Sequence, residues 1–163
     1  MKPLTVLVLI TLLLPLTAHA RLGETEPELT ARFGRPQTKG KFSTFAQGHT
    51  IPLGWELTFR QNDWTITCDL VDDRCARIRY YKPGDWTDDQ ILTVLTVNAQ
   101  GAKWSDITKP ANRYYVREWK REDGAIAHWQ RGLSMTITTP AFEQAEMLAK
   151  EKAKVEASQI PNL

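Results

Sequence analysis

The chain has 163 residues, of which 25% are charged and 42% hydrophobic, and its formal net charge is only +2. Basic and acidic side chains are interspersed along it, without the basic stripe that is typical of nucleic-acid-binding proteins. Low-complexity segments are also absent. These properties exclude nucleic acid as the expected partner and favour an ordinary globular protein over a disordered one.

The first twenty residues have the three parts of a secretory signal peptide. Lys2 gives a basic start, residues 4–16 are nearly all Leu, Val, Ile and Thr, and Ala18 and Ala20 are small residues where a signal peptidase reads. The apolar run is shorter than the roughly 20 residues that span a bilayer. We therefore expect residues 1–20 to be removed and residues 21–163 to be exported to the periplasm or the medium.

Two kinds of membrane attachment are alternatives to release of the mature chain. A retained N-terminal anchor remains an alternative to removal of the signal. A lipid anchor is disfavoured, because a bacterial lipoprotein needs a cysteine at the cleavage point and the first cysteine is Cys68. No later stretch is apolar enough to span a membrane, so stable membrane insertion after signal cleavage is not expected.

Residues 21–163 predict a single α+β domain that contains three helices. Thr25 and Glu28 fit a capping box for a short helix, and Thr87 and Gln90 fit a second capping box before an apolar helical face. Residues 141–157, rich in Ala, Glu and Lys, predict a C-terminal helix.

Strands are expected after each of the first two helices. Alternating apolar and polar residues predict strands over residues 55–59, 64–70 and 76–80 in the first half, and over 114–121, 125–129 and 133–137 in the second. Each half is thus a helix followed by an antiparallel meander. Residues 21–82 and 83–139 are consistent with a duplication, which a single sequence leaves open.

Cys68 and Cys75 are the only cysteines and flank a predicted turn. In an oxidising compartment, two cysteines on adjoining strands favour a disulfide. Regular alternation opposes the bond, because it places Cys68 on the apolar face and Cys75 on the face of Arg77. A β-bulge near the turn would bring both onto one face. A structural disulfide is expected, with two buried thiols or a redox role as alternatives.

Catalytic and metal-binding patterns are weak. His49 and His128 are the only histidines after the signal, and they lack the spacing of a zinc site. No serine stands in a nucleophile-elbow pattern, and the paired aspartates are explained by turns and helix capping. We therefore expect no catalytic residue, no metal and no cofactor.

Aromatic residues that alternate with Arg, Lys and Glu are the remaining signal. Adjacent aromatic residues of a strand face opposite ways, so some of them lie outside the main core. Trp, Tyr and Arg also dominate the energetic hot spots of protein interfaces. The alternative is that one member of each pair fills the core and the other is merely exposed. Our candidates for an interaction surface are Trp86, Trp104, Trp119 and Trp129.

Two blocks near the start of the exported chain carry a resemblance. Gly23-Glu24-Thr25 and Arg32-Phe33-Gly34-Arg35-Pro36 resemble a recurring opening, GET…RYG.P, of uncharacterised small exported bacterial proteins. Residues 86–104 and 119–124 resemble later blocks of the same group. More distantly, the order of helix and meander resembles β-lactamase-inhibitor-protein-like modules, which include small outer-membrane-assembly lipoproteins. The absent lipid-anchor cysteine departs from those lipoproteins.

The resemblance implies an exported binding or envelope module and supplies no catalytic residue. We therefore expect a non-catalytic protein that binds a protein or another component of the bacterial cell envelope. A small periplasmic hydrolase is the alternative, and it requires a pocket that holds His49 or His128 beside a carboxylate or a hydroxyl. A purely structural accessory domain is a third hypothesis.

Overall fold

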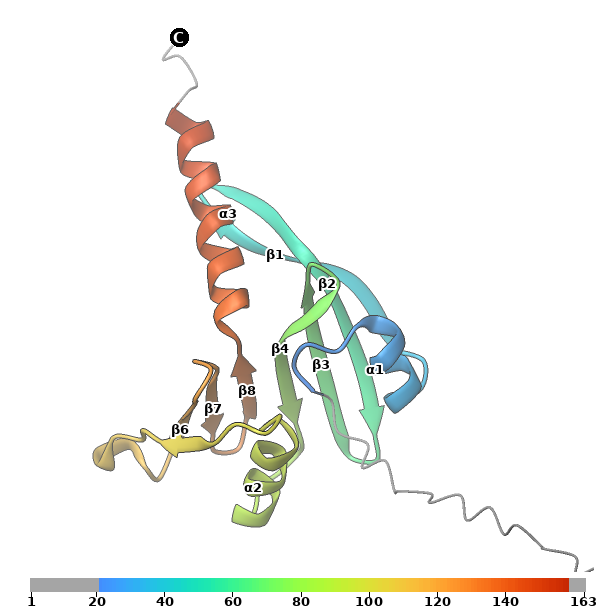
Figure 1. Cartoon of the computed structure of the whole chain (residues 1–163), viewed down its shortest axis with the longest axis vertical. Helices are drawn as coiled ribbons and strands as arrows, with labels where there is room; N and C mark the ends of the chain where they lie inside the picture. Colours follow the sequence, from blue (N-terminus) through green and yellow to red (C-terminus); the bar gives the residue numbers. More distant parts are fainter. Residues whose placement is uncertain (1–20, 159–163) are drawn as a thin grey trace, which may run out of the picture.

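The computed structural model describes residues 21–158, so the predicted signal peptide lies outside the described residues (Figure 1). Two helices each precede a run of strands, and a third helix follows the last strand. In chain order the elements are α1 (Glu26–Phe33), β1 (Thr38–Ala46), β2 (His49–Gln61), β3 (Trp64–Val71), β4 (Arg74–Tyr81), α2 (Asp88–Val97), β5 (Trp104–Asp106), the 3₁₀ turn η1 (Pro110–Asn112), β6 (Val116–Arg121), β7 (Ile126–Gln130), β8 (Ser134–Thr138) and α3 (Pro140–Ser158).

All eight strands form one antiparallel sheet in the order β1-β2-β3-β4-β8-β7-β6-β5. The first half contributes four neighbouring strands and the second half the other four, and their last strands, β4 and β8, pair at the centre. This confirms the predicted α+β class with a helix and an antiparallel meander in each half. The duplication itself stays a prediction.

Both predicted capping boxes are present. The Glu28 carboxylate accepts the backbone N–H of Thr25 at 2.7 Å, and this bond lowers the pKa of Glu28. At α2, the Gln90 N–H donates to the Thr87 hydroxyl at 3.3 Å, while the Gln90 side chain accepts the Thr87 N–H at 3.1 Å. Each box satisfies N–H groups that a helix start otherwise leaves without a partner.

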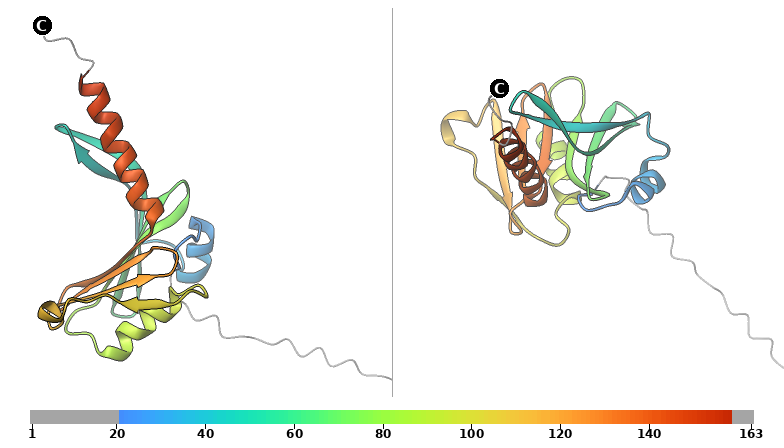
Figure 2. Two further views of the ribbon diagram at one scale, coloured as in Figure 1. Left: turned by 60° about the vertical axis from the view of Figure 1, so that its left-hand side comes forward. Right: turned by 90° about the horizontal axis from the view of Figure 1, so that it is seen from above.

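The buried apolar side chains form two clusters. Figure 2 shows that α3 lies apart from α1 and α2. The larger cluster combines α1, α2 and one sheet face, and it includes Leu29, Val94 and Cys75. The smaller cluster includes Phe142 of α3 and Ala76 of β4. Neighbouring residues of one strand thus belong to different clusters, so the sheet separates two cores.

The predicted bulge is present between β3 and β4. Asp72 and Asp73 both have positive φ, as a two-residue hairpin turn requires. The register then shifts at Asp69/Leu70, which places both Cys68 and Cys75 in the larger core. Because of the bulge, the two cysteine side chains lie on the same face of the sheet although regular alternation would place them on opposite faces.

Two strands were not predicted. The edge strand β1 buries only Phe42 and Thr44, so it lacks the alternation that identifies a half-buried strand. The other edge strand, β5, has only three residues. The predicted C-terminal helix is confirmed as α3, which buries Phe142 and Ala153, while Met147 and Leu148 are exposed.

Candidate functional site

The four tryptophans proposed as an interaction surface do not form one in the structure. Trp86, Trp119 and Trp129 are 7%, 5% and 6% exposed and belong to the larger core. Trp104 packs against this core, and its indole N–H donates to the Leu95 carbonyl at 2.8 Å. The burial of these indole rings has a structural cause. In the second half of the sheet they pack beside the small side chains of Ala125 and Ala127 and fill the core there.

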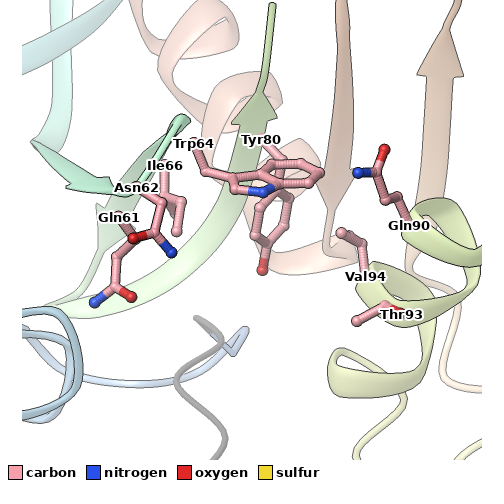
Figure 3. A pocket seen from close by; sticks show the side chains of 8 residues that line it. All are labelled: Gln61, Asn62, Trp64, Ile66, Tyr80, Gln90, Thr93 and Val94. Atoms are coloured by element: carbon pink, nitrogen blue, oxygen red, sulfur yellow. The ribbon is translucent and has the colours of Figure 1, made fainter. Parts of the chain in front are cut away.

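A hollow beside α2 offers a different candidate site. Its volume is about 350 Å³, and Figure 3 shows side chains from the β2–β3 turn on one side and from α2 on the other, with Trp64 and Tyr80 between them. The residues that line it are Gln61, Asn62, Trp64, Ile66, Tyr80, Gln90, Thr93 and Val94. The site therefore joins the two halves of the chain.

Local structure fixes the polar groups of the hollow. Asn62 stands in the β2–β3 turn with a φ of 55°, a conformation that asparagine tolerates better than most residues. Gln90 uses its side-chain oxygen to cap α2, which leaves its NH₂ group available as a donor. Within residues 21–158, the side-chain amides of Gln61 and Asn62 have no hydrogen-bond partner. Three carboxamides thus border one hollow.

Packing and a hydrogen bond also fix the two aromatic side chains of the hollow, Trp64 and Tyr80. Trp64 packs edge-on against Trp86, with ring centroids 4.6 Å apart, and the Lys82 ammonium lies 5.8 Å from the centre of the Trp64 ring. Tyr80 is buried, which raises the pKa of its phenol, and its oxygen accepts the Asn98 side-chain N–H at 3.0 Å. The Trp64 ring is half-buried and is therefore the largest apolar surface that a ligand would meet.

This arrangement suits a neutral, hydrogen-bonding ligand. Carboxamides donate and accept without a charge, and among residues 21–158 the Tyr80 phenol, which is buried, is the one titratable group that lines the hollow. A planar ring beside such groups is the usual composition of a binding site, in which apolar area supplies affinity and a few polar groups fix orientation.

The two histidines on which the hydrolase alternative depends lie in different places, and only His49 lines a hollow beside a hydroxyl and a carboxylate. His128 contacts Glu118 at 3.2 Å on the sheet face away from the larger core, where both side chains are solvent-accessible. His49 lines a hollow of about 510 Å³ with Thr50 and Glu156, between the β1–β2 hairpin and α3. No hydrogen bond within the described chain connects His49 to that hydroxyl or carboxylate.

Cys68 and Cys75 are free thiols in the structure, and both are buried. Contact with the Cys68 thiol, together with burial, raises the pKa of the Cys75 thiol. A raised thiol pKa disfavours the reactive thiolate, so a nucleophilic role is not supported. The disulfide stays a prediction, and the shared face of the two side chains is compatible with it.

Neither a metal-binding group nor a membrane-spanning helix is found among the described residues. Between residues 21 and 158, no group of three or more His, Cys, Asp or Glu side chains is placed to hold a metal ion. In the same range, no helix combines the length and the apolar content needed to cross a membrane.

Comparisons of the chain with protein-family models, curated proteins and solved structures give no match. The candidate site therefore stands on its geometry. No sequence pattern indicated this site. Gln61 and Asn62 stand in the turn between two predicted strands, and Gln90 is explained by the capping box of the second helix. The one available signal was Trp64, a tryptophan directly after a turn at the start of a strand.

Proposed function

We propose that the protein is an exported, non-catalytic binding protein of the bacterial cell envelope, and that it holds an uncharged polypeptide segment in the hollow between α2 and β3. The observation that carries this proposal is that three carboxamides line one hollow together with the half-buried ring of Trp64. A peptide group has one donor and one acceptor, and a carboxamide side chain complements both.

The construction of the hollow supports a binding role. A ligand is bound with less loss of entropy when the groups that receive it are already ordered. The capping bonds of Gln90 and the contact of Trp64 with Trp86 provide such order. Export of the chain, predicted from residues 1–20, and its resemblance to small exported envelope proteins support a partner in the same compartment.

The proposal can be tested by site-specific photo-crosslinking in bacterial cells. A photoreactive amino acid at Asn62, on the rim of the hollow, is expected to crosslink one discrete envelope protein. The matched control is the same amino acid at Arg60, which is exposed on the same hairpin but does not line the hollow. The substitution Trp64→Leu, which keeps an apolar side chain but removes the ring, is expected to abolish the Asn62 crosslink.

The outcomes separate the hypotheses. A crosslink at Asn62 that is absent at Arg60 and lost in the folded Trp64→Leu variant supports polypeptide binding in the hollow. Equal crosslinking at both positions, or a crosslink that persists in Trp64→Leu, contradicts it. Crosslinks to glycan or lipid alone also contradict it, because they identify a different class of ligand.

A further inference from the structure

A second, more polar hollow lies on the other side of Trp86. Its volume is about 320 Å³, and three guanidinium groups, from Arg113, Arg117 and Arg131, line it together with Trp86 and Trp129. Trp86 packs against Trp64, which lines the first hollow, so the Trp64–Trp86 pair connects the two hollows. None of the three arginines lines the first hollow.

The residues of this second hollow hold unpartnered hydrogen-bond donors. Across residues 21–158, five buried side-chain nitrogen or oxygen atoms have no hydrogen-bond partner. Three of these five belong to residues that line this hollow: the indole Nε1 of Trp86, the indole Nε1 of Trp129 and Nε of Arg117. A buried donor without an acceptor costs free energy, and native structures contain few of them. Three of the five thus belong to residues that border this one hollow.

The charges indicate which acceptor fits. Arg117 donates to Asp88 at 2.6 Å and Arg131 to Asp85 at 2.8 Å, and Arg113 donates to Asp106, which lies outside the lining. The lining itself holds three guanidinium groups and two carboxylates. The Asp88 side chain is 80% exposed, and an ion pair with so exposed a partner is weak. An anionic ligand therefore competes for the Arg117 guanidinium with a carboxylate that binds it only weakly.

The two arginines are also held in place by aromatic rings. The guanidinium carbon of Arg131 lies 4.3 Å from the centre of the Tyr114 ring, and that of Arg117 lies 5.0 Å from the centre of the Trp119 ring. Stacking on rings leaves the edges of a guanidinium group available, and those edges match the oxygens of a carboxylate or phosphate.

We propose that the hollow between Trp86, Trp129 and the three arginines is a binding site for an oxyanion, carried by a ligand as a carboxylate or a phosphate group. The oxyanion binds the guanidinium edges that border the hollow and competes with Asp88 for the Arg117 guanidinium. Both indole nitrogens are buried, so a hydrogen bond from either of them to the oxyanion requires a local shift of the side chains. The site is independent of the polypeptide-binding hollow, and failure of one proposal leaves the other intact.

The indole N–H groups provide a direct test by nuclear magnetic resonance of the mature protein. The indole signals of Trp86 and Trp129, assigned with Trp86→Phe and Trp129→Phe, are expected to shift in a saturable way on titration with phosphate or acetate. Sodium chloride keeps the ionic strength constant. The indole signal of Trp104 is the internal control, because its N–H is already bonded to Leu95.

Comparison of the two probes identifies the ligand class: tighter binding of phosphate indicates a phosphorylated ligand, and tighter binding of acetate indicates a carboxylate. Arg117→Gln is expected to weaken binding about tenfold, the loss typical of one charge-assisted hydrogen bond. Asp88→Asn removes the competing carboxylate and is expected to tighten binding severalfold. Arg60→Gln, at an exposed arginine outside the hollow, is the control and leaves the affinity unchanged.

The proposal is overturned if the Trp86 and Trp129 signals do not shift, or if the Trp104 signal shifts equally. It is also overturned if Asp88→Asn leaves the affinity unchanged. Because Asp88 is exposed, this variant is expected to fold, so the test does not depend on the more buried Arg117.

Discussion

Asp69 is the most tightly enclosed charged residue in the sheet. Its side chain is fully buried, and it accepts a hydrogen bond from Arg77 at 2.5 Å and one from Arg79 at 3.0 Å. Arg79 also binds Glu56, and the Arg77 guanidinium lies 4.1 Å from the centre of the Phe142 ring. Burial raises the pKa of Asp69, while the two guanidinium groups oppose this shift.

The raised pKa of Asp69 predicts a pH dependence of stability. The folded state holds the Asp69 proton more tightly than the unfolded chain, so the contribution of this group is largest at low pH and is lost as pH rises through the folded pKa. The amide that Asp69→Asn introduces does not titrate. We therefore expect the free energy of unfolding of Asp69→Asn, relative to the wild type, to increase between about pH 3 and about pH 7. Urea unfolding at several pH values measures this difference.

A suitable control is Asp73→Asn, because Asp73 is exposed in the β3–β4 turn and its positive φ is one that asparagine tolerates. It reports the effect of losing a solvated carboxylate. If the Asp69→Asn difference falls with pH, the two arginines outweigh burial and the assigned direction is wrong.

At the residue scale, the sequence predicted roles that depend on near neighbours. The cap residues Thr25 and Thr87 were recognised because a capping box spans only four positions. The burial of Asp69 and the convergence of Asn62 with Gln90 depend on contacts between distant segments. No pattern along the chain encodes such contacts.

At the scale of elements, the β1–β2 hairpin depends on one glycine. A Cβ atom at Gly54 would lie 1.8 Å from the Leu70 carbonyl oxygen of β3. The register of β1 and β2 shifts at the same place, where Phe42 pairs with Gly54 and Ser43 with Pro52. At this point β2 therefore lies so close to the backbone of β3 that only glycine fits at position 54.

Gly54→Ala is therefore expected to destabilise the fold. The methyl group forces the backbone of β2 away from β3, and overpacking of this kind costs about 1–3 kcal/mol in the free energy of unfolding. Gly40→Ala in β1 is the matched control, because a methyl group there would meet no atom within 4 Å and the φ of Gly40 is not positive. There we expect no loss, or a gain of up to about 1 kcal/mol. Equal loss in both variants would contradict the close approach.

Most elements were predictable because local signals define them. The six predicted strands all lie within or overlap observed strands, and the turn at residues 72–73 was also confirmed. The bulge beside it, which the sequence left open, is present. The edge strands β1 and β5 were missed because an edge strand buries little and its pairing comes from a neighbour. Periodicity reports burial, so it cannot report strands that lack it.

At the scale of the whole molecule, the sheet order determines which tryptophans are buried. The pairing of β4 with β8 brings the second half beside the first, and Trp129 and Trp119 then pack beneath α2 instead of facing a partner. The burial of these tryptophans therefore does not follow from either half of the sequence alone.

The separation of the two cores predicts how the molecule loosens when one of them is damaged. Phe142 of α3 stacks on Phe42 of β1 with ring centroids 5.9 Å apart, and the larger core lies on the other sheet face. Phe142→Ala removes this stack and is expected to cost about 3–5 kcal/mol of local stability. Hydrogen exchange should accelerate in α3 and β1, while the amides of β7 and β8 keep their protection.

Met147→Ala is the matched control for that measurement, because Met147 lies on the exposed side of the same helix. It should leave the exchange of β1 unchanged, since it removes no contact with the hairpin. If Phe142→Ala accelerates exchange uniformly over the sheet, the two faces unfold as a single cooperative unit. Faster exchange in α3 and β1 with unchanged protection in β7 and β8 shows instead that the smaller core opens separately, because β7 and β8 contribute no residue to it.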